Sequence, residues 1–158
     1  HHFDMIRYIS GQEPTSVHAM TWNQPWGWHA GDACHAIVFK FASGLVATHV
    51  AVGCAVGSRT NYNGDWRIEG PGGSIDWNAG QTSYSHLHRT QEKVDKRPLE
   101  HLEVKAGEQT MMDEFFAAIA EKREPECGAR DNLKSLAMVF GAIQSAKEGR
   151  VVNLDELS

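Results

Sequence analysis

The segment TWNQPWGWHAGDA, residues 21–33, concentrates side chains that suit the binding of a sugar. Flat tryptophan rings can stack on the apolar face of a sugar ring, while amides and carboxylates bind its hydroxyls. We therefore name Trp22, Asn23 and His29 as candidate substrate-binding residues. The same composition also fits an aromatic loop that only packs on itself, or a subunit interface.

A second polar segment, SRTNYNGDW at residues 58–66, supplies two more candidates for substrate binding, Arg59 and Tyr62. If the edges of a sheet bring this segment close to residues 21–33, the two segments form one pocket wall.

Histidine is unusually frequent, with nine residues in the chain. His86 and His88 are two apart in a strand-like stretch and point the same way, so they could hold one metal ion. No third ligand is placed by the sequence to complete such a site, so a polar sheet face or a subunit contact is the better explanation of the pair. We therefore predict no metal site.

The opening stretch HHFDMIRYISG allows two interpretations. His1 and His2 could be the remnant of a purification tag, or they could lie at the edge of an active site. Apolar residues at helical spacing predict a short helix over residues 2–10 that stops at Gly11, and its cap residue is expected before His1.

Strand patterns separated by glycine and asparagine occupy residues 16–104. FASGLV at residues 41–46 is typical of a hairpin, so neighbouring strands are expected to be antiparallel. The stretch at residues 45–56 is apolar on both alternating faces, which predicts a strand covered on both sides. The glycine-rich GPGGSI at residues 70–75 lies between strand patterns and predicts a turn, because no helix follows it as a dinucleotide-binding loop requires.

Two helices are predicted near the end of the chain, followed by a short strand at residues 151–154. Thr110 with Asp113 resembles a capping box for the first helix, and Asp131 is expected to cap the second. Their predicted buried stripes are Met112, Phe115, Phe116 and Ile119 in the first helix, and Leu133, Leu136, Ala137, Phe140 and Ile143 in the second. The sum is an α+β fold, an open and mostly antiparallel sheet with helices on one face and the other face available for a subunit contact.

Composition excludes several partners. The 158 residues carry a net charge of −5 and no cluster of basic residues, which argues against nucleic acid and anionic membranes. No stretch approaches the roughly 20 apolar residues of a membrane-spanning helix. Three widely spaced cysteines predict buried free thiols, and we expect a cytoplasmic protein.

With these segments placed, the chain resembles the C-terminal domain of the Gfo/Idh/MocA (glucose-fructose oxidoreductase, inositol dehydrogenase) family. The segments that carry the resemblance are HHFDMIRYISGQEPTSVHA, WRIEGPGGSI and MMDEFFAAIAEKREPECGARDNLKSLAMVFGAIQSAKEGRVVNL. It covers residues 1–158 as one substrate-binding and oligomerisation domain. A tag would have to imitate both His1 and its spacing to Asp4, so the resemblance favours an active-site edge.

The resemblance implies an NAD(P)-dependent oxidoreductase whose N-terminal Rossmann domain and catalytic lysine lie outside this chain. Its active-site histidine belongs to an Asp-x-x-x-His-x-x-Asp segment, and His1 with Asp4 matches the second half of that segment. We expect NAD or NADP to bind the full-length protein, and no cofactor to bind this chain alone. The implied substrate is a sugar, polyol or cyclitol, and the implied assembly is a homodimer or homotetramer through the sheet face.

Oxidation of a carbinol by hydride loss requires a base for the hydroxyl proton, and imidazole has a pKa near the working pH. His1 would act as that base or hold the hydroxyl, and Asp4, one helical turn away, would orient the ring or cap the helix. The alternative to the oxidoreductase is a stand-alone binding or assembly module that keeps the sheet without redox chemistry.

Overall fold

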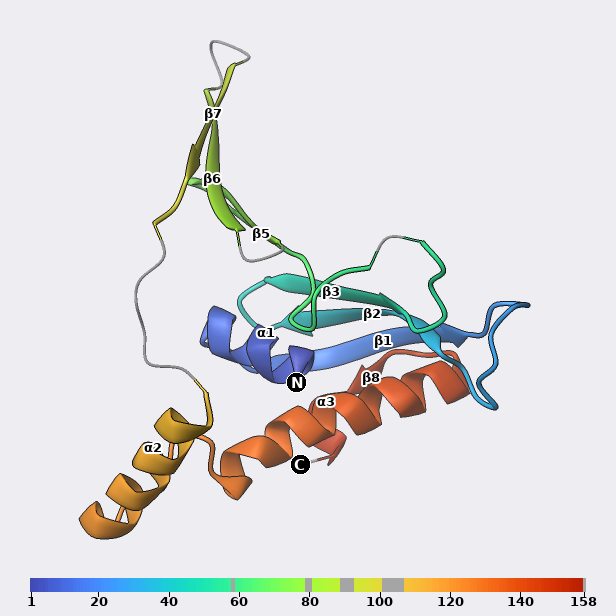
Figure 1. Ribbon diagram of the computed structural model, residues 1–158. Coiled ribbons are helices and arrows are strands. Elements are labelled where there is room, and N and C mark those ends of the chain that lie inside the picture. Colours follow the sequence, from blue (N-terminus) through green and yellow to red (C-terminus); the bar gives the residue numbers. More distant parts are fainter. Residues whose placement is uncertain (58, 79–80, 89–92, 101–106, 158) are drawn as a thin grey trace. The chain divides into compact units, whose positions relative to one another are not determined.

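The computed structural model describes residues 1–57, 59–78, 81–88, 93–100 and 107–157 (Figure 1). The chain forms two compact units, which we call unit 1 (residues 1–56 and 114–158) and unit 2 (residues 57–113). The expected α+β class with antiparallel strands is confirmed. The strands are divided between two four-stranded sheets, one in each unit.

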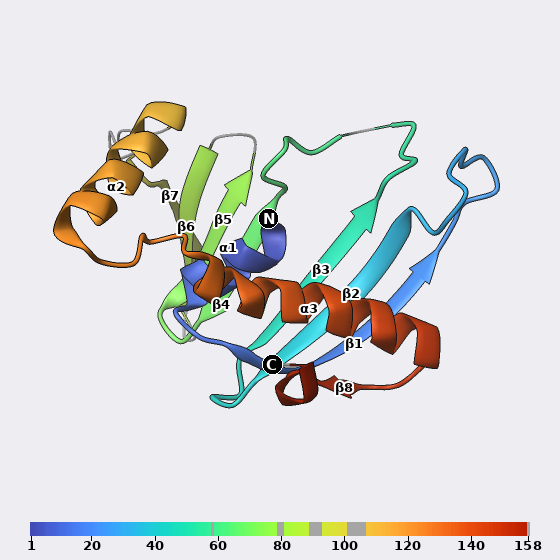
Figure 2. The ribbon, with the colours of Figure 1, turned by 90° about the horizontal axis from the view of Figure 1, so that it is seen from below.

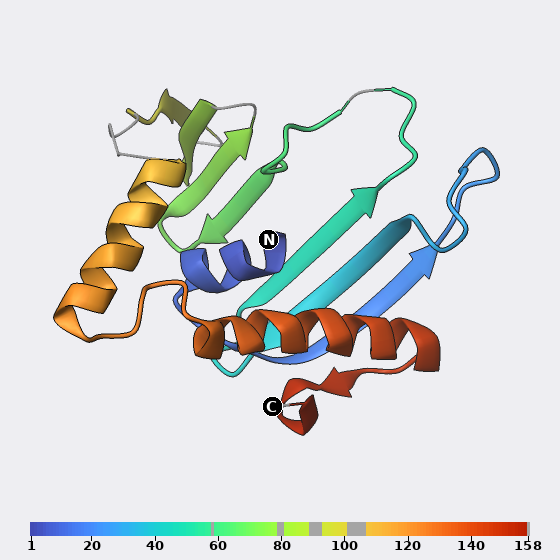
Figure 3. The same cartoon turned by 60° about the horizontal axis from the view of Figure 1, so that its bottom comes forward.

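The sheet of unit 1 has the strand order β3-β2-β1-β8, and its neighbouring strands are antiparallel. The strands are β1 (Pro14–Trp22), β2 (Cys34–Phe41), β3 (Val46–Val52) and β8 (Val152–Asn153). The predicted hairpin joins β2 to β3, and Gly44 takes the positive φ of 89° that this tight connection requires. Figures 2 and 3 show the helices α1 (His2–Ser10) and α3 (Ala129–Glu148) on one face of this sheet.

The core of unit 1 lies between that face and the helices. Val17 pairs with Phe39 across β1 and β2, and both side chains are almost completely buried. Phe3 of α1 packs edge-on against Phe39, with ring centroids 4.9 Å apart. Alternation along the strands therefore places the apolar half of each strand beneath the helices.

The other face of the sheet carries exposed apolar side chains within unit 1. Met20 of β1 and Val50 of β3 are about two-thirds exposed, at 65% and 67%. The predicted strand at residues 45–56 ends at Val52, and its side chains alternate between exposed and partly buried. The prediction of two covered faces is therefore wrong for one chain, although the apolar character that prompted it is present on the open face.

Helix α1 ends as predicted. Gly11 adopts a left-handed conformation with φ 63°, and its N–H donates to the carbonyl of Arg7. The N-cap is His1, whose side chain makes no capping hydrogen bond.

Helix α3 buries a different face from the predicted one. Its buried positions include Ser135, Met138, Ala142 and Ser145, while Leu133, Leu136, Phe140 and Ile143 are exposed. The reason is polar: the hydroxyl of Ser145 accepts a hydrogen bond from the backbone N–H of Ala19 at 2.9 Å, which requires a small side chain against β1. Asp131 is not the cap either, because Gly128 takes that position and the Asp131 carboxylate binds Arg7.

Unit 2 contains the sheet β4-β5-β6-β7. Its strands are β4 (Trp66–Gly70), β5 (Gly73–Asn78), β6 (Gln81–His88) and β7 (Lys93–Pro98). The predicted turn at residues 70–75 joins β4 to β5, with Gly73 at φ 137°. The strand β7 was not predicted, because its sequence KVDKRP lacks the alternation of apolar and polar residues that is typical of a strand. The strand expected at residues 99–104 falls on irregular backbone at Leu99–Glu100 and then outside the described residues.

Helix α2 (Glu108–Glu121) begins before Thr110, so that residue lies inside the helix and not at its cap. The predicted stripe of Met112, Phe115, Phe116 and Ile119 is exposed. The short final strand is confirmed as β8, and a 3-10 turn, η1 (Leu154–Leu157), follows it. None of the helices in the described part of the chain is long and apolar enough to cross a membrane.

Candidate functional site

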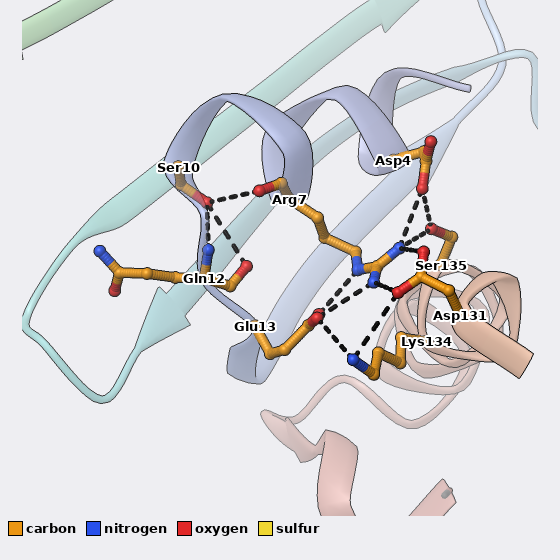
Figure 4. Close-up of polar contacts among 8 residues, drawn as sticks. All are labelled: Asp4, Arg7, Ser10, Gln12, Glu13, Asp131, Lys134 and Ser135. Atoms are coloured by element: carbon orange, nitrogen blue, oxygen red, sulfur yellow. Dashed lines mark hydrogen bonds and ion pairs between the residues drawn. The ribbon is translucent and has the colours of Figure 1, made fainter. Parts of the chain in front are cut away.

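Arg7 occupies the centre of a charged cluster that joins α1 to α3 (Figure 4). Its guanidinium binds both oxygens of Glu13, at 2.7 and 3.0 Å, and both oxygens of Asp131, at 2.7 and 3.2 Å. It also donates to Asp4 at 2.9 Å and to the hydroxyl of Ser135 at 2.8 Å. The planar guanidinium presents its N–H groups in a fork, which lets it donate two hydrogen bonds to the two oxygens of one carboxylate.

Each charged group in this cluster stabilises the ionised form of its partners. The hydrogen bonds that Arg7 donates to Glu13 raise the pKa of Arg7, although burial of the guanidinium opposes the shift. The hydrogen bonds from Arg7 lower the pKa of Glu13 and of Asp131. All three groups are therefore ionised at neutral pH, and α1 is fixed to α3 by a side chain that is only 7% exposed.

Three imidazoles form a second connection between α1 and the sheet. Nδ1 of His2 lies 3.0 Å from Nε2 of His49 on β3, and Nδ1 of His49 lies 2.8 Å from Nε2 of His35 on β2. The rings of His35 and His49 are nearly parallel, with centroids 5.0 Å apart. We call His2, His49 and His35 the imidazole chain.

Two members of the imidazole chain, His49 and His35, are neutral at neutral pH. Burial lowers the pKa of His49 to about 4, and positive charge on His35 or on His2 would lower it in the same direction. Burial also lowers the pKa of His35, with His2 contributing. Neutral rings can each donate one hydrogen bond and accept another, which is what a chain of three requires.

The two candidate catalytic residues lie beside these two groups. His1 is exposed at the start of α1, its carbonyl accepts the N–H of Met5 at 3.0 Å, and its ring lies 5.5 Å from that of His2. Oδ1 of Asp4 accepts hydrogen bonds from Arg7 and, at 2.6 Å, from Ser135. The carboxylate that was expected to orient His1 or cap the helix is thus part of the Arg7 cluster.

The aromatic segment between β1 and β2 is tied to itself and to the end of β3. Nδ2 of Asn23 donates to the carbonyl of His29 at 3.0 Å, and the ring of Trp28 stacks on that of His29 with centroids 4.8 Å apart. Trp26 donates from its indole N–H to the carbonyl of Cys54 at 3.0 Å. Trp28 is 78% exposed, so its ring is available for stacking on a ligand.

The remaining candidates, Arg59 and Tyr62, are exposed in unit 2. In the same unit, Nδ1 of His86 lies 2.9 Å from the carbonyl oxygen of Gly72, which also accepts a hydrogen bond from the Tyr84 hydroxyl. An open groove of about 370 Å³ lies here, lined by Gly72, Tyr84, His86, Asp95, Lys96 and Arg97.

The side chain of His88 lies outside the described residues. Among the residues whose placement is described, no group of three or more histidine, cysteine or acidic side chains could hold a metal ion. The cysteines are free thiols, with Cys34 and Cys54 buried and Cys127 exposed against expectation.

Sequence reasoning missed Arg7, His35 and His49. The spacing of Asp4 and Arg7, three residues apart on a helix, was an available signal for an ion pair. No comparable signal links His35 to His49, because their proximity follows from the register of β2 with β3.

The chain matches the family model described as "Oxidoreductase family, C-terminal alpha/beta domain" over residues 1–154, a range that includes His1 and Asp4. An uncharacterized protein of Sinorhizobium fredii, y4oX, is 26% identical over 169 aligned residues, which cover 99% of this chain and 45% of that protein.

Solved structures of oxidoreductases have a similar fold. An oxidoreductase from Agrobacterium radiobacter, in complex with NAD+, L-tartaric acid and magnesium, superposes with a TM-score of 0.77 at 16% identity, over 99% of this chain and 47% of that one. An aldose-aldose oxidoreductase from Caulobacter crescentus, complexed with glycerol, gives 0.75 at 21% identity, over 96% and 44%. The chain therefore spans less than half the length of these relatives.

Proposed function

Since the chain belongs to the Gfo/Idh/MocA oxidoreductase family as its C-terminal alpha/beta domain, we propose that it supplies the substrate-binding part of an NAD(P)-dependent oxidoreductase. The proposed substrate is a sugar, polyol or cyclitol that is oxidised at a hydroxyl group. The observation that carries the proposal is the family match over His1–Asp4, together with the anchoring of the helix that begins there. An aldose-acting enzyme and an NAD+ complex among the similar folds support the substrate and cofactor classes.

The proposed role of this chain is to bind the substrate and to accept its proton. His1 takes the hydroxyl proton as a general base, and in the reverse direction it returns the proton as an acid. The exposed ring of Trp28 and the neighbouring Trp22, Asn23 and His29 give the stacking surface and polar groups that a sugar needs.

The glycine-rich segment at residues 70–75 is not a dinucleotide-binding loop. The glycine-rich stretch at residues 70–75 forms a hairpin turn between β4 and β5, whereas a phosphate-binding loop must lead into a helix. The proposal therefore assigns NAD or NADP to a part of the full-length protein outside this chain.

We further propose that the open face of the unit 1 sheet binds a second copy of the protein. Its exposed apolar side chains, among them Met20, Val46, Val50 and Val52, follow alternate positions of two strands that pair with β2. An apolar face of this kind is typical of an obligate subunit contact.

The test uses the full-length protein that contains this chain, with NAD or NADP and a panel of sugars, polyols and cyclitols. Reduction of the cofactor is measured by the absorbance of the reduced nicotinamide. Replacing His1 with asparagine should lower kcat by about a hundredfold or more, the usual contribution of a general base. Tyr8→Phe, on an exposed residue of the same helix, is the control and should keep the wild-type rate. Retention of the wild-type kcat in His1→Asn would refute the role of His1, and substrate binding without reduction of either cofactor would favour the binding module.

A further inference from the structure

The imidazole chain connects the first turn of α1 to the two strands beneath it. His2 follows His1 directly, and its ring reaches His49 on β3, which in turn reaches His35 on β2. Phe3 also contacts the ring of His49, against which it packs edge-on with ring centroids 5.5 Å apart. His49 is therefore the central member, with one ring nitrogen directed at each neighbour.

The two hydrogen bonds couple the tautomers of the three rings. A neutral imidazole carries one N–H, so His49 can donate to His35 only while it accepts from His2, or the reverse. The whole chain thus has two arrangements, and each fixes which nitrogen of His2 carries the proton. A proton added to His2 or to His35 can be accommodated, but two charged rings cannot both remain bonded to His49.

We propose that His49 is a positioning residue for the reaction at His1, holding the tautomer and ring orientation of His2 and fixing the first turn of α1 on the sheet. The inference rests on the proposed function, because it assumes that chemistry takes place at His1. It needs no substrate contact by His49 itself, which is partly buried beneath the helix. Such support is required because a catalytic group displaced by about 1 Å can lose a hundredfold in rate.

The first experiment determines the tautomers of the three rings in the imidazole chain and needs no assay of activity. Histidine-selective ¹⁵N NMR of the full-length protein should show His2, His49 and His35 each as a single fixed tautomer at neutral pH. His49→Phe keeps the aromatic contact to Phe3 and removes both nitrogens, so His2 and His35 should then show mixed tautomers. Unchanged nitrogen shifts of His2 and His35 in this variant would overturn the inference.

The second experiment measures the reaction. His49→Ala should lower kcat by about ten- to a hundredfold with little change in KM. Added imidazole can occupy the cavity left by the His49 ring and hydrogen-bond both His2 and His35, so it should restore most of kcat. Pyrrole has a donor N–H but no acceptor nitrogen, so it should not restore kcat. Circular dichroism verifies that the variant is folded, and imidazole added to the wild-type protein is the control.

The outcomes separate this inference from the proposed function. Equal rescue by pyrrole and imidazole, or wild-type kcat in His49→Ala while His1→Asn is inactive, would show that His49 only packs. Full activity in His1→Asn would instead refute the proposed role of His1 as the base, even if NMR finds the three tautomers linked, and absence of cofactor reduction with every substrate in the wild-type protein would refute the proposed function.

Discussion

Replacing Arg7 with alanine is expected to destabilise unit 1, because it removes a buried cation that three carboxylates share and leaves the exposed Lys134 to pair with two of them, Glu13 and Asp131. The guanidinium is 7% exposed, and its bonds to Glu13 and Asp131 are both bidentate. Loss of one partner from a fully buried pair costs about 3–5 kcal/mol. The carboxylates are each 47% exposed and can regain water, so we expect a loss of about 2–3 kcal/mol at neutral pH.

The pH dependence of this loss follows from the same contacts. Arg7 lowers the pKa of Glu13 and Asp131 below their values in the unfolded chain. Carboxylates with a lowered pKa stabilise the fold above the unfolded pKa, about 4, and this contribution disappears as the pH falls through the folded values. The difference in stability between the wild type and Arg7→Ala should therefore narrow in acid.

Native-state hydrogen exchange is the suitable assay, because it reports on α1 and α3 separately from unit 2. Urea unfolding followed by circular dichroism gives the overall comparison. Arg67→Ala is the matched control, since its pair with Glu69 is 70% and 60% exposed and should not change exchange measurably. Arg7→Lys keeps the charge without the fork and should fall between the wild type and alanine. Equal losses in Arg7→Ala and Arg67→Ala, or a difference that persists unchanged in acid, would refute the electrostatic argument.

Three further changes give separate tests. As the pH falls from about 6.5 towards 4, the unfolded chain takes up a proton at His49 while the folded chain does not. His49→Phe should therefore reduce the stability lost between pH 7 and pH 5 by about 1–2 kcal/mol, as measured by thermal melts at the two pH values. In Gly53→Ala the new Cβ would lie 2.7 Å from a backbone carbonyl oxygen, so a loss of about 1–3 kcal/mol is expected in the same melts, whereas Gly31→Ala meets open space and should be neutral. Val50→Glu on the open sheet face should dissociate the proposed oligomer in sedimentation velocity, and Val56→Glu, exposed beyond the end of β3, should not.

The elements that the sequence predicts well are those set by local chemistry. Gly11 and Gly149 end their helices in the left-handed conformation, and the hairpin at Gly44 lies where expected. The buried face of α3 was predicted wrongly because hydrophobic periodicity gives most weight to large side chains. Here the sheet instead contacts Ser145, which supplies a hydroxyl to a backbone N–H.

The candidate site could be predicted only where residues adjacent in sequence carry it. His1 and Asp4 are close along one helix, and the resemblance to a family identifies them. The groups that position α1 come from distant segments: Asp131 is 124 residues from Arg7, and His49 is 47 residues from His2. Such contacts depend on strand register and helix packing, which no local pattern in a single sequence specifies.

Short helices are marginal alone in water, so α1 depends on its contacts with the rest of unit 1. His1 directly precedes this helix, so the contacts that hold α1 contribute to the position of His1. The Arg7 cluster fixes the second turn to α3, and the imidazole chain fixes the first turn to β3 and β2. Both connections are intact at neutral pH and weaken in acid, for different chemical reasons. If His1 is the base, the reaction should therefore lose its precise geometry well below neutral pH, in addition to losing the unprotonated imidazole.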